Sequence, residues 1–153
     1  MKKLLISGLG GSLFPYLDDA LKNKYQIFYL DSNPALKWLY KDLSFTLAPL
    51  VADPAYKKLV TTTIENNDID CYIPLIDEEL LLAKDGIGQN IKVNVMAPDV
   101  GFIKLCLNKY KLMQFLDENN LSHITSYLGS EFESQMPFPV FAKPVAGRGS
   151  RGI

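Results

Sequence analysis

The sequence of 153 residues is poor in cysteine and has no long apolar run. Its two cysteines, Cys71 and Cys106, lie far apart in apolar segments, so neither a disulfide framework nor a cysteine metal site is indicated. We expect two buried free thiols and a cytoplasmic protein. No run approaches the roughly 18 apolar residues of a membrane-spanning helix, so we expect no contact with a membrane.

An excess of one charge is also absent. Sixteen Lys and Arg residues stand against seventeen Asp and Glu residues, which gives a formal net charge of -1. A protein that binds nucleic acid without sequence preference needs a strongly positive surface, so we expect no nucleic-acid partner. The 48% hydrophobic and 22% charged residues are typical of a soluble globular domain.

Short apolar runs alternate with helical patterns through the first hundred residues. The runs predict buried strands at 2–7, 25–30, 45–47, 71–76 and 92–96, and the segment 79–83 is expected to belong to a helix. Apolar stripes at helical spacing are Leu13, Leu17, Ala20 and Leu21, and then Tyr56, Leu59, Val60 and Ile64. Trp38 is expected to pack on the sheet edge. Alternating helices and apolar strands predict an open α/β fold with a parallel sheet covered on both faces.

The pattern changes after residue 97, and we place a domain boundary near residues 98–107. A helical stretch is followed by a second helix that begins at Lys109, where Asn108 is suited to be the N-cap. A strand is expected at 140–143. These elements are too few to enclose a core of their own.

The loop GLGGS at 8–12 joins the first strand to the first helix, where backbone N–H groups favour an anion. Asp31 ends the second strand, about where a dinucleotide fold places its ribose-binding acid. The match to G-x-G-x-x-G is incomplete, because leucine occupies the third glycine position. Gly10 and Gly11 are candidate substrate-side residues. The alternative is a tight turn with Ser12 as the helix N-cap.

Three consecutive acids, Asp77, Glu78 and Glu79, follow the fourth strand. They lie at the sheet edge where open α/β folds bind ligands, which makes Asp77 and Glu78 candidate substrate-side residues. Acids in the first turn of a helix also stabilise the helix through its dipole. The sequence leaves both roles open.

Two lysines and a glycine-rich loop suit a phosphate ligand. Lys109 stands at the start of a helix, where the dipole disfavours a cation, and Lys143 lies on an otherwise apolar strand. The glycines and arginines of the loop supply N–H donors and positive charge. A solvated lysine and an ordinary glycine-rich turn are the alternatives. The loop residues are Ala146, Gly147, Arg148, Gly149, Ser150, Arg151 and Gly152.

The segments CLNKYKLMQFLDENNLSHITSY and FPVFAKPVAGRGSRGI resemble the opening of an ATP-grasp domain. The preceding residues resemble a pre-ATP-grasp domain, with SGLGGS, LDSNP, IPLIDEELL and LCLNKYK in the order found in the carbamoyl-phosphate-synthase-like group. The resemblance implies a Rossmann-like pre-ATP-grasp domain at residues 1–100 and the N-terminal part of an ATP-grasp domain at residues 101–153.

The resemblance also implies a ligase that joins a small carboxylate to an amine through an acyl phosphate, with ATP and magnesium as cofactors. Lys109, Lys143 and the 146–152 loop would contact the ATP phosphates. The family's adenine hinge and magnesium ligands are not found by residue 153, so we expect an N-terminal fragment without turnover and without metal ligands of its own. A split enzyme and a free-standing nucleotide-binding or interaction module are the alternatives. The sequence is also compatible with a homo-oligomer.

Overall fold

The computed structural model describes residues 1–43, 45–133, 136 and 138–147. It divides into two compact units, Met1–Val100 and Gly101–Ile153. Each unit is described by itself. Within the described ranges, no helix is long and apolar enough to cross a membrane.

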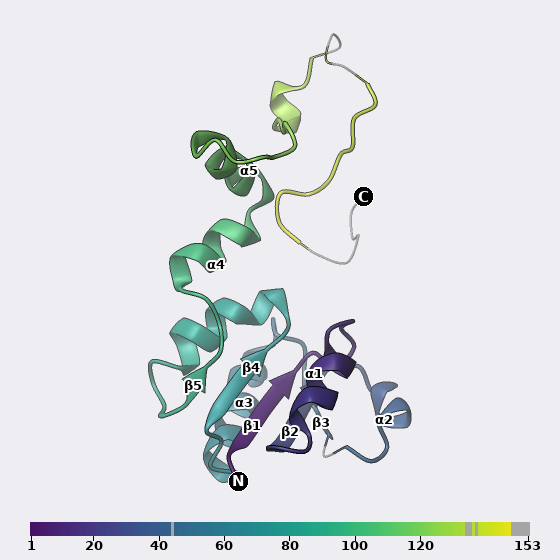
Figure 1. Ribbon diagram of the computed structural model, residues 1–153, viewed down its shortest axis with the longest axis vertical. Coiled ribbons are helices and arrows are strands. Elements are labelled where there is room, and N and C mark those ends of the chain that lie inside the picture. Colours follow the sequence, from purple (N-terminus) through teal and green to yellow (C-terminus); the bar gives the residue numbers. More distant parts are fainter. Residues whose placement is uncertain (44, 134–135, 137, 148–153) are drawn as a thin grey trace. The chain divides into compact units, whose positions relative to one another are not determined.

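Strands and helices alternate along the first unit, as the sequence pattern predicts (Figure 1). The helix expected to include 79–83 begins as a 3-10 turn and continues into a π-helical segment. The elements are β1 (Lys3–Ser7), α1 (Phe14–Leu21), β2 (Gln26–Asp31), α2 (Leu36–Leu39), β3 (Phe45–Leu47), α3 (Pro54–Asn66), β4 (Cys71–Pro74), η1 (Asp77–Glu79), η2 (Leu82–Ile87) and β5 (Asn94–Val95).

All five strands pair in parallel, in the order β3-β2-β1-β4-β5. Leu5 of β1 faces a core cluster with buried residues of α3 and η2. Its neighbours Leu4 and Ile6 face the opposite cluster, with Phe14 of α1 and Leu36 of α2. Because successive side chains of a strand point to opposite faces, the sheet is buried on both sides. The predicted α/β, Rossmann-like parallel sheet is confirmed.

Helix α3 shows why these residues form these elements. Asp53 is its N-cap, and the Asp53 Oδ1 atom accepts a hydrogen bond from the Ala55 N–H at 2.8 Å. Proline occupies the first helical position, where the backbone N–H that it lacks would have no partner within the helix. Tyr56, Val60 and Ile64, four residues apart, are its buried face.

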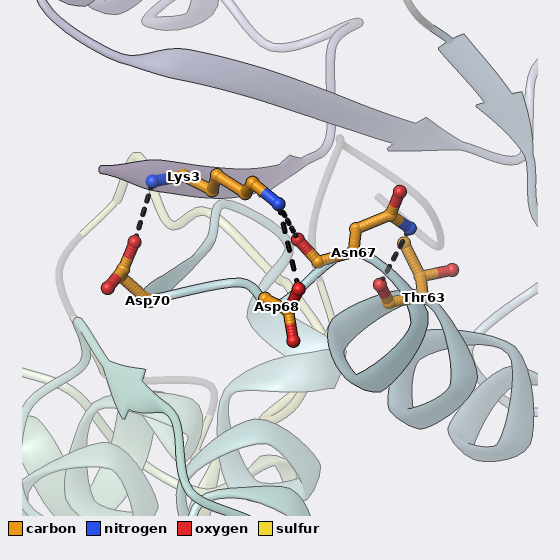
Figure 2. A network of polar contacts seen from close by, with 5 residues as sticks. All are labelled: Lys3, Thr63, Asn67, Asp68 and Asp70. Atoms are coloured by element: carbon orange, nitrogen blue, oxygen red, sulfur yellow. Dashed lines mark hydrogen bonds and ion pairs between the residues drawn. The ribbon is translucent and has the colours of Figure 1, made fainter. Parts of the chain in front are cut away.

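Lys3 ties the start of β1 to the end of α3 (Figure 2). Its backbone N–H donates to Asp70 Oδ2 at 2.7 Å, and its Nζ donates to the Asn67 carbonyl at 2.8 Å. The same Nζ lies 3.8 Å from Asp68 Oδ2, while Asn67 Nδ2 donates to the Thr63 carbonyl at 2.9 Å. Carbonyls at a helix C-terminus favour a cation, so this contact stabilises the helix end.

Two expectations about apolar residues are wrong. Trp38 is 77% exposed, because the four-residue helix α2 directs only Leu36 into the core. Cys71 is half-buried and Cys106 is exposed, although both are free thiols.

The second unit contains α4 (Val100–Leu107), which begins at the boundary, α5 (Lys109–Glu118) and the 3-10 turn η3 (Gly129–Glu131). The strand expected at 140–143 is not formed, and Val140 and Phe141 are exposed. A strand needs a neighbour to pair its N–H and C=O groups, and the described residues of this unit include no strand to do so. Helix α5 has no fully buried residue.

Candidate functional site

The carboxyl ends of β1 and β4 lie side by side at the centre of the sheet. Ser7, the last residue of β1, is paired with Pro74 of β4 and with Leu30 of β2. The chain places β2 and β3 on one side of β1 and β4 and β5 on the other, so the strand order reverses between β1 and β4. Open α/β folds bind ligands outside the carboxyl ends of strands at such a point. The loops after β1 and β4 therefore form the candidate site of the first unit.

The loop after β1 turns sharply at Gly8, whose φ is 83°. The Gly8 N–H donates to the Leu30 carbonyl at 3.0 Å, and the Gly11 N–H donates to the Gly8 carbonyl at 3.2 Å. A Cβ atom on Gly8 would lie 2.9 Å from Ile76 Cγ1 in the loop after β4. Both the backbone conformation and this close approach require glycine. Gly10 and Gly11 are exposed at the same edge.

Asp31 holds the glycine loop from the end of β2. Its Oδ2 atom accepts a hydrogen bond from the Gly10 N–H at 3.2 Å, and its Oδ1 atom accepts one from the Asn33 N–H at 2.8 Å. Ser12 is not the N-cap of α1, because the chain enters this helix at Leu13 through successive tight turns and no side chain caps it. Asp31 therefore holds the glycine loop through a hydrogen bond with its backbone.

The three acids after β4 differ in exposure. Asp77 and Glu78 are exposed on η1, whereas Glu79 is fully buried. Consecutive residues of a helical turn point in different directions, so three neighbours do not share one face. Glu79 does contribute a capping contact, because its Oε1 atom accepts a hydrogen bond from the Ile76 N–H at 3.1 Å.

Four donors converge on the Glu79 carboxylate. Oε1 accepts the Ser7 hydroxyl as well as the Ile76 N–H, and Oε2 accepts the hydroxyls of Tyr56 and Tyr72, the latter at 2.9 Å. The donors come from β1, the loop after β4, α3 and β4 itself. Together they occupy the lone-pair sites of one carboxylate. Across the described residues, no buried side-chain polar atom lacks a hydrogen-bond partner.

Burial raises the pKa of Glu79 above its ordinary value, and the four donors oppose that shift. Burial, followed by the charge of Glu79, raises the pKa values of Tyr56 and Tyr72 as well. In the described part of the chain, the groups that shift the pKa of Glu79 are three hydroxyls and one backbone N–H, with no cation. A buried carboxyl group with a raised pKa, at the edge where open α/β folds bind ligands, is a candidate functional group.

Sequence reasoning missed the inward position of Glu79, although the sequence contains a signal for it. Glu79, Ala83 and Ile87 are four residues apart, and all three are buried. Residues at this spacing share one helical face. An acid in register with an apolar helical face predicts a buried carboxylate that needs hydrogen-bond donors.

The second unit brings Lys109 and Gly147 together. Lys109 Nζ donates to the Gly147 carbonyl at 2.6 Å, and the Lys109 backbone N–H donates to the Val145 carbonyl at 2.9 Å. Asn108 is the N-cap of α5, because its Oδ1 atom accepts the Lys111 N–H at 3.0 Å. The φ of Gly147 is 114°, a conformation that favours glycine. An ammonium group thus lies at the start of the glycine-rich segment.

Of the other predicted phosphate-site residues, the structure describes Lys143 and Ala146, and both are exposed. No group of three or more His, Cys, Asp or Glu residues that could hold a metal ion occurs within the described ranges. The residues Arg148, Gly149, Ser150, Arg151 and Gly152 lie outside the described residues.

No family model and no curated protein matches the sequence. Solved structures do match, among them N5-carboxyaminoimidazole ribonucleotide synthetase from Thermotoga maritima, with a TM-score of 0.54 and 18% sequence identity. The match covers 78% of this chain and 31% of that chain. At this identity the likeness shows the fold alone, and the chain spans less than a third of the length of that synthetase.

Proposed function

We propose that the chain is the front part of an ATP-dependent carboxylate–amine ligase of the ATP-grasp, carbamoyl-phosphate-synthase-like type. In this proposal residues 1–100 are the Rossmann-like pre-ATP-grasp domain, and residues 101–153 begin the ATP-binding domain. The parallel sheet and the likeness to the fold of a synthetase support the proposal. The ordered sequence motifs support it independently.

The observation that carries the proposal is the contact between Lys109 and Gly147. These residues are 38 positions apart, yet the Lys109 Nζ atom donates to the Gly147 carbonyl. A second hydrogen bond, from the Lys109 N–H to the Val145 carbonyl, fixes the same two segments. A lysine ammonium beside glycine-rich backbone is a suitable arrangement for a phosphate group, because charge and N–H donors act together.

In the proposed reaction these residues act by position and charge. Lys109, Lys143 and the 146–152 loop would contact the ATP phosphates and stabilise the charge of the transferred group. Gly10, Gly11, Asp77 and Glu78 are weaker candidates for the side of the carboxylate or amine substrate. When bound, magnesium would neutralise phosphate charge. We assign its ligands to a longer form of the protein, since the described residues contain no suitable group.

Calorimetry with MgATP tests the proposal. We expect tight binding by a longer form of the same reading frame and weak binding by the 153-residue chain. In the longer form, Lys109→Met should weaken binding about 10- to 100-fold, the size of one charge-assisted hydrogen bond. Lys111→Met is the matched control on the exposed surface of α5 and should change binding about twofold or less.

Two results would each contradict a part of this proposal. Equal binding of MgATP by the short and long forms would mean that the 153 residues already hold a complete nucleotide site, with the loop after β1 as the first candidate. Acceptor-dependent release of phosphate from ATP by the 153-residue chain would show that it is not an inactive fragment.

A further inference from the structure

Glu79 connects the two loops of the candidate site in the first unit. Its Oε1 atom accepts hydrogen bonds from Ser7, which directly precedes Gly8, and from the backbone of Ile76. Gly8 and Ile76 in turn approach so closely that a Cβ atom on Gly8 would lie 2.9 Å from Ile76 Cγ1. A displacement at either side of the carboxylate would therefore reach both loops.

We infer that Glu79 is a positioning residue for this edge of the sheet, and that gain or loss of one proton at its carboxyl group changes the position of both loops together. The loops carry the exposed residues Gly10, Gly11, Asp77 and Glu78. The inference concerns the first unit and does not depend on ATP binding. It goes beyond the proposed function, which assigns no role to Glu79.

The hydrogen bonds indicate which oxygen takes up the proton. Oε1 accepts the Ile76 N–H, and a backbone N–H cannot become an acceptor. Both partners of Oε2 are tyrosine hydroxyls, Tyr56 and Tyr72, and a hydroxyl can reverse its role by rotating its hydrogen. A proton on Oε2 can therefore be donated in a hydrogen bond to one of these hydroxyls, while Oε1 becomes the oxygen of a neutral carboxyl group and accepts the Ser7 hydroxyl and the Ile76 N–H more weakly.

Burial favours proton uptake by Glu79, and the donors around its carboxylate oppose it. Tyr56 from α3 and Tyr72 from β4 face the carboxylate, and Ser7 from β1 is not titratable. On its own turn, Asp77 and Glu78 are exposed acids.

Carbon-13 NMR of the full chain with labelled glutamate tests the inference. The side-chain carboxyl carbon of Glu79 should titrate with a midpoint above the ordinary pKa of a glutamate. The amide signals of Gly8 and Ile76 should shift with the Glu79 midpoint. The inference is overturned if these amides do not follow that midpoint, or if Glu79 does not titrate before the protein unfolds.

Two variants and one control, Glu65→Gln, test whether the amide transition comes from Glu79. Glu79→Gln should remove the transition from the Gly8 and Ile76 amides, whereas Glu65→Gln should leave it unchanged. Tyr56→Phe removes one donor to the ionised form, so the Glu79 midpoint should rise. Persistence of the amide transition in Glu79→Gln, or an unchanged midpoint in Tyr56→Phe, would contradict the inference. If either variant fails to fold, the titration of the wild type decides the inference.

Discussion

The two ends of β1 are joined to the rest of the first unit by opposite kinds of polar contact. At the amino end, Lys3 meets the end of α3 and its following turn, where Asp68 has a side chain 91% exposed (Figure 2). At the carboxyl end, Ser7 donates to Glu79, which is 0% exposed. One end uses solvated charges, and the other uses a buried carboxylate surrounded by neutral donors.

The two ends of β1 are expected to differ in how much their polar contacts contribute to the free energy of unfolding. Exposed ion pairs contribute about 0–1 kcal/mol, because water and salt replace them easily. Removing one member of a buried hydrogen-bond network leaves its partners unsatisfied, at about 1–3 kcal/mol for each buried donor or acceptor. The carboxyl end is therefore expected to be the sensitive one, and it is also the edge where ligands bind in such folds.

Glu79→Ala should have the largest effect on this contrast. It leaves three hydroxyls and the Ile76 N–H without their acceptor, so the free energy of unfolding should fall by about 3 kcal/mol or more, since each unsatisfied buried donor costs about 1–3 kcal/mol. Urea unfolding followed by circular dichroism measures the loss. Glu65→Ala, on the exposed side of α3, is the control and should change stability by about 0.5 kcal/mol or less. Equal losses of unfolding free energy in Glu79→Ala and Glu65→Ala would show that the buried carboxylate contributes no more than an exposed one.

Gly8→Ala should have an intermediate effect, because the same edge is tightly packed. Its Cβ atom would lie 2.9 Å from Ile76 Cγ1, and a φ of 83° is strained for alanine, so we expect a loss of about 1–3 kcal/mol in urea unfolding. Gly10→Ala is the matched control, since its Cβ atom would come no closer than 3.8 Å to a neighbour. A Gly8 variant as stable as the Gly10 variant would mean that the two loops are not held together as described.

Lys3→Ala should have the smallest effect. The backbone N–H bond to Asp70 remains, and only the part-buried contact of Nζ with the Asn67 carbonyl and its ion pair with the exposed Asp68 are lost. We expect about 1 kcal/mol or less, decreasing further in high salt. A loss as large as that of Glu79→Ala, measured by the same urea unfolding, would show that the amino end is equally essential.

The fold of the first unit was predictable because each strand and helix carries its own pattern. The stripe of Tyr56, Val60 and Ile64 predicts α3 directly, and the apolar run of β1 predicts a strand buried on both faces. The cluster around Glu79 was not predictable in the same way. Its donors Ser7 and Tyr56 are 72 and 23 residues from Glu79, and sequence spacing does not report contacts at that range.

In the second unit, a feature that depends on neighbouring residues was predicted correctly, and a feature that depends on a distant partner was not. The cap at Asn108 was expected and is formed, because it depends on neighbouring residues alone. The strand expected at 140–143 is not formed, because a strand depends on a partner that its own sequence does not specify. The assignment of Lys109 and Gly147 to an ATP phosphate site stays a prediction, supported by the hydrogen bond between them.

The pH dependence of the difference in unfolding free energy between the wild type and Glu79→Gln tests the central claim most directly. Burial raises the pKa of Glu79 above its ordinary 4.5 in the folded chain, so the folded state holds this proton more tightly than the unfolded state. The contribution of Glu79 to stability is therefore full below about pH 4.5 and is lost as the pH rises through the raised value. We predict that the wild type loses stability relative to Glu79→Gln over this interval. A constant difference, or a relative gain by the wild type as the pH rises, would contradict the account, because the four donors would then balance or outweigh burial.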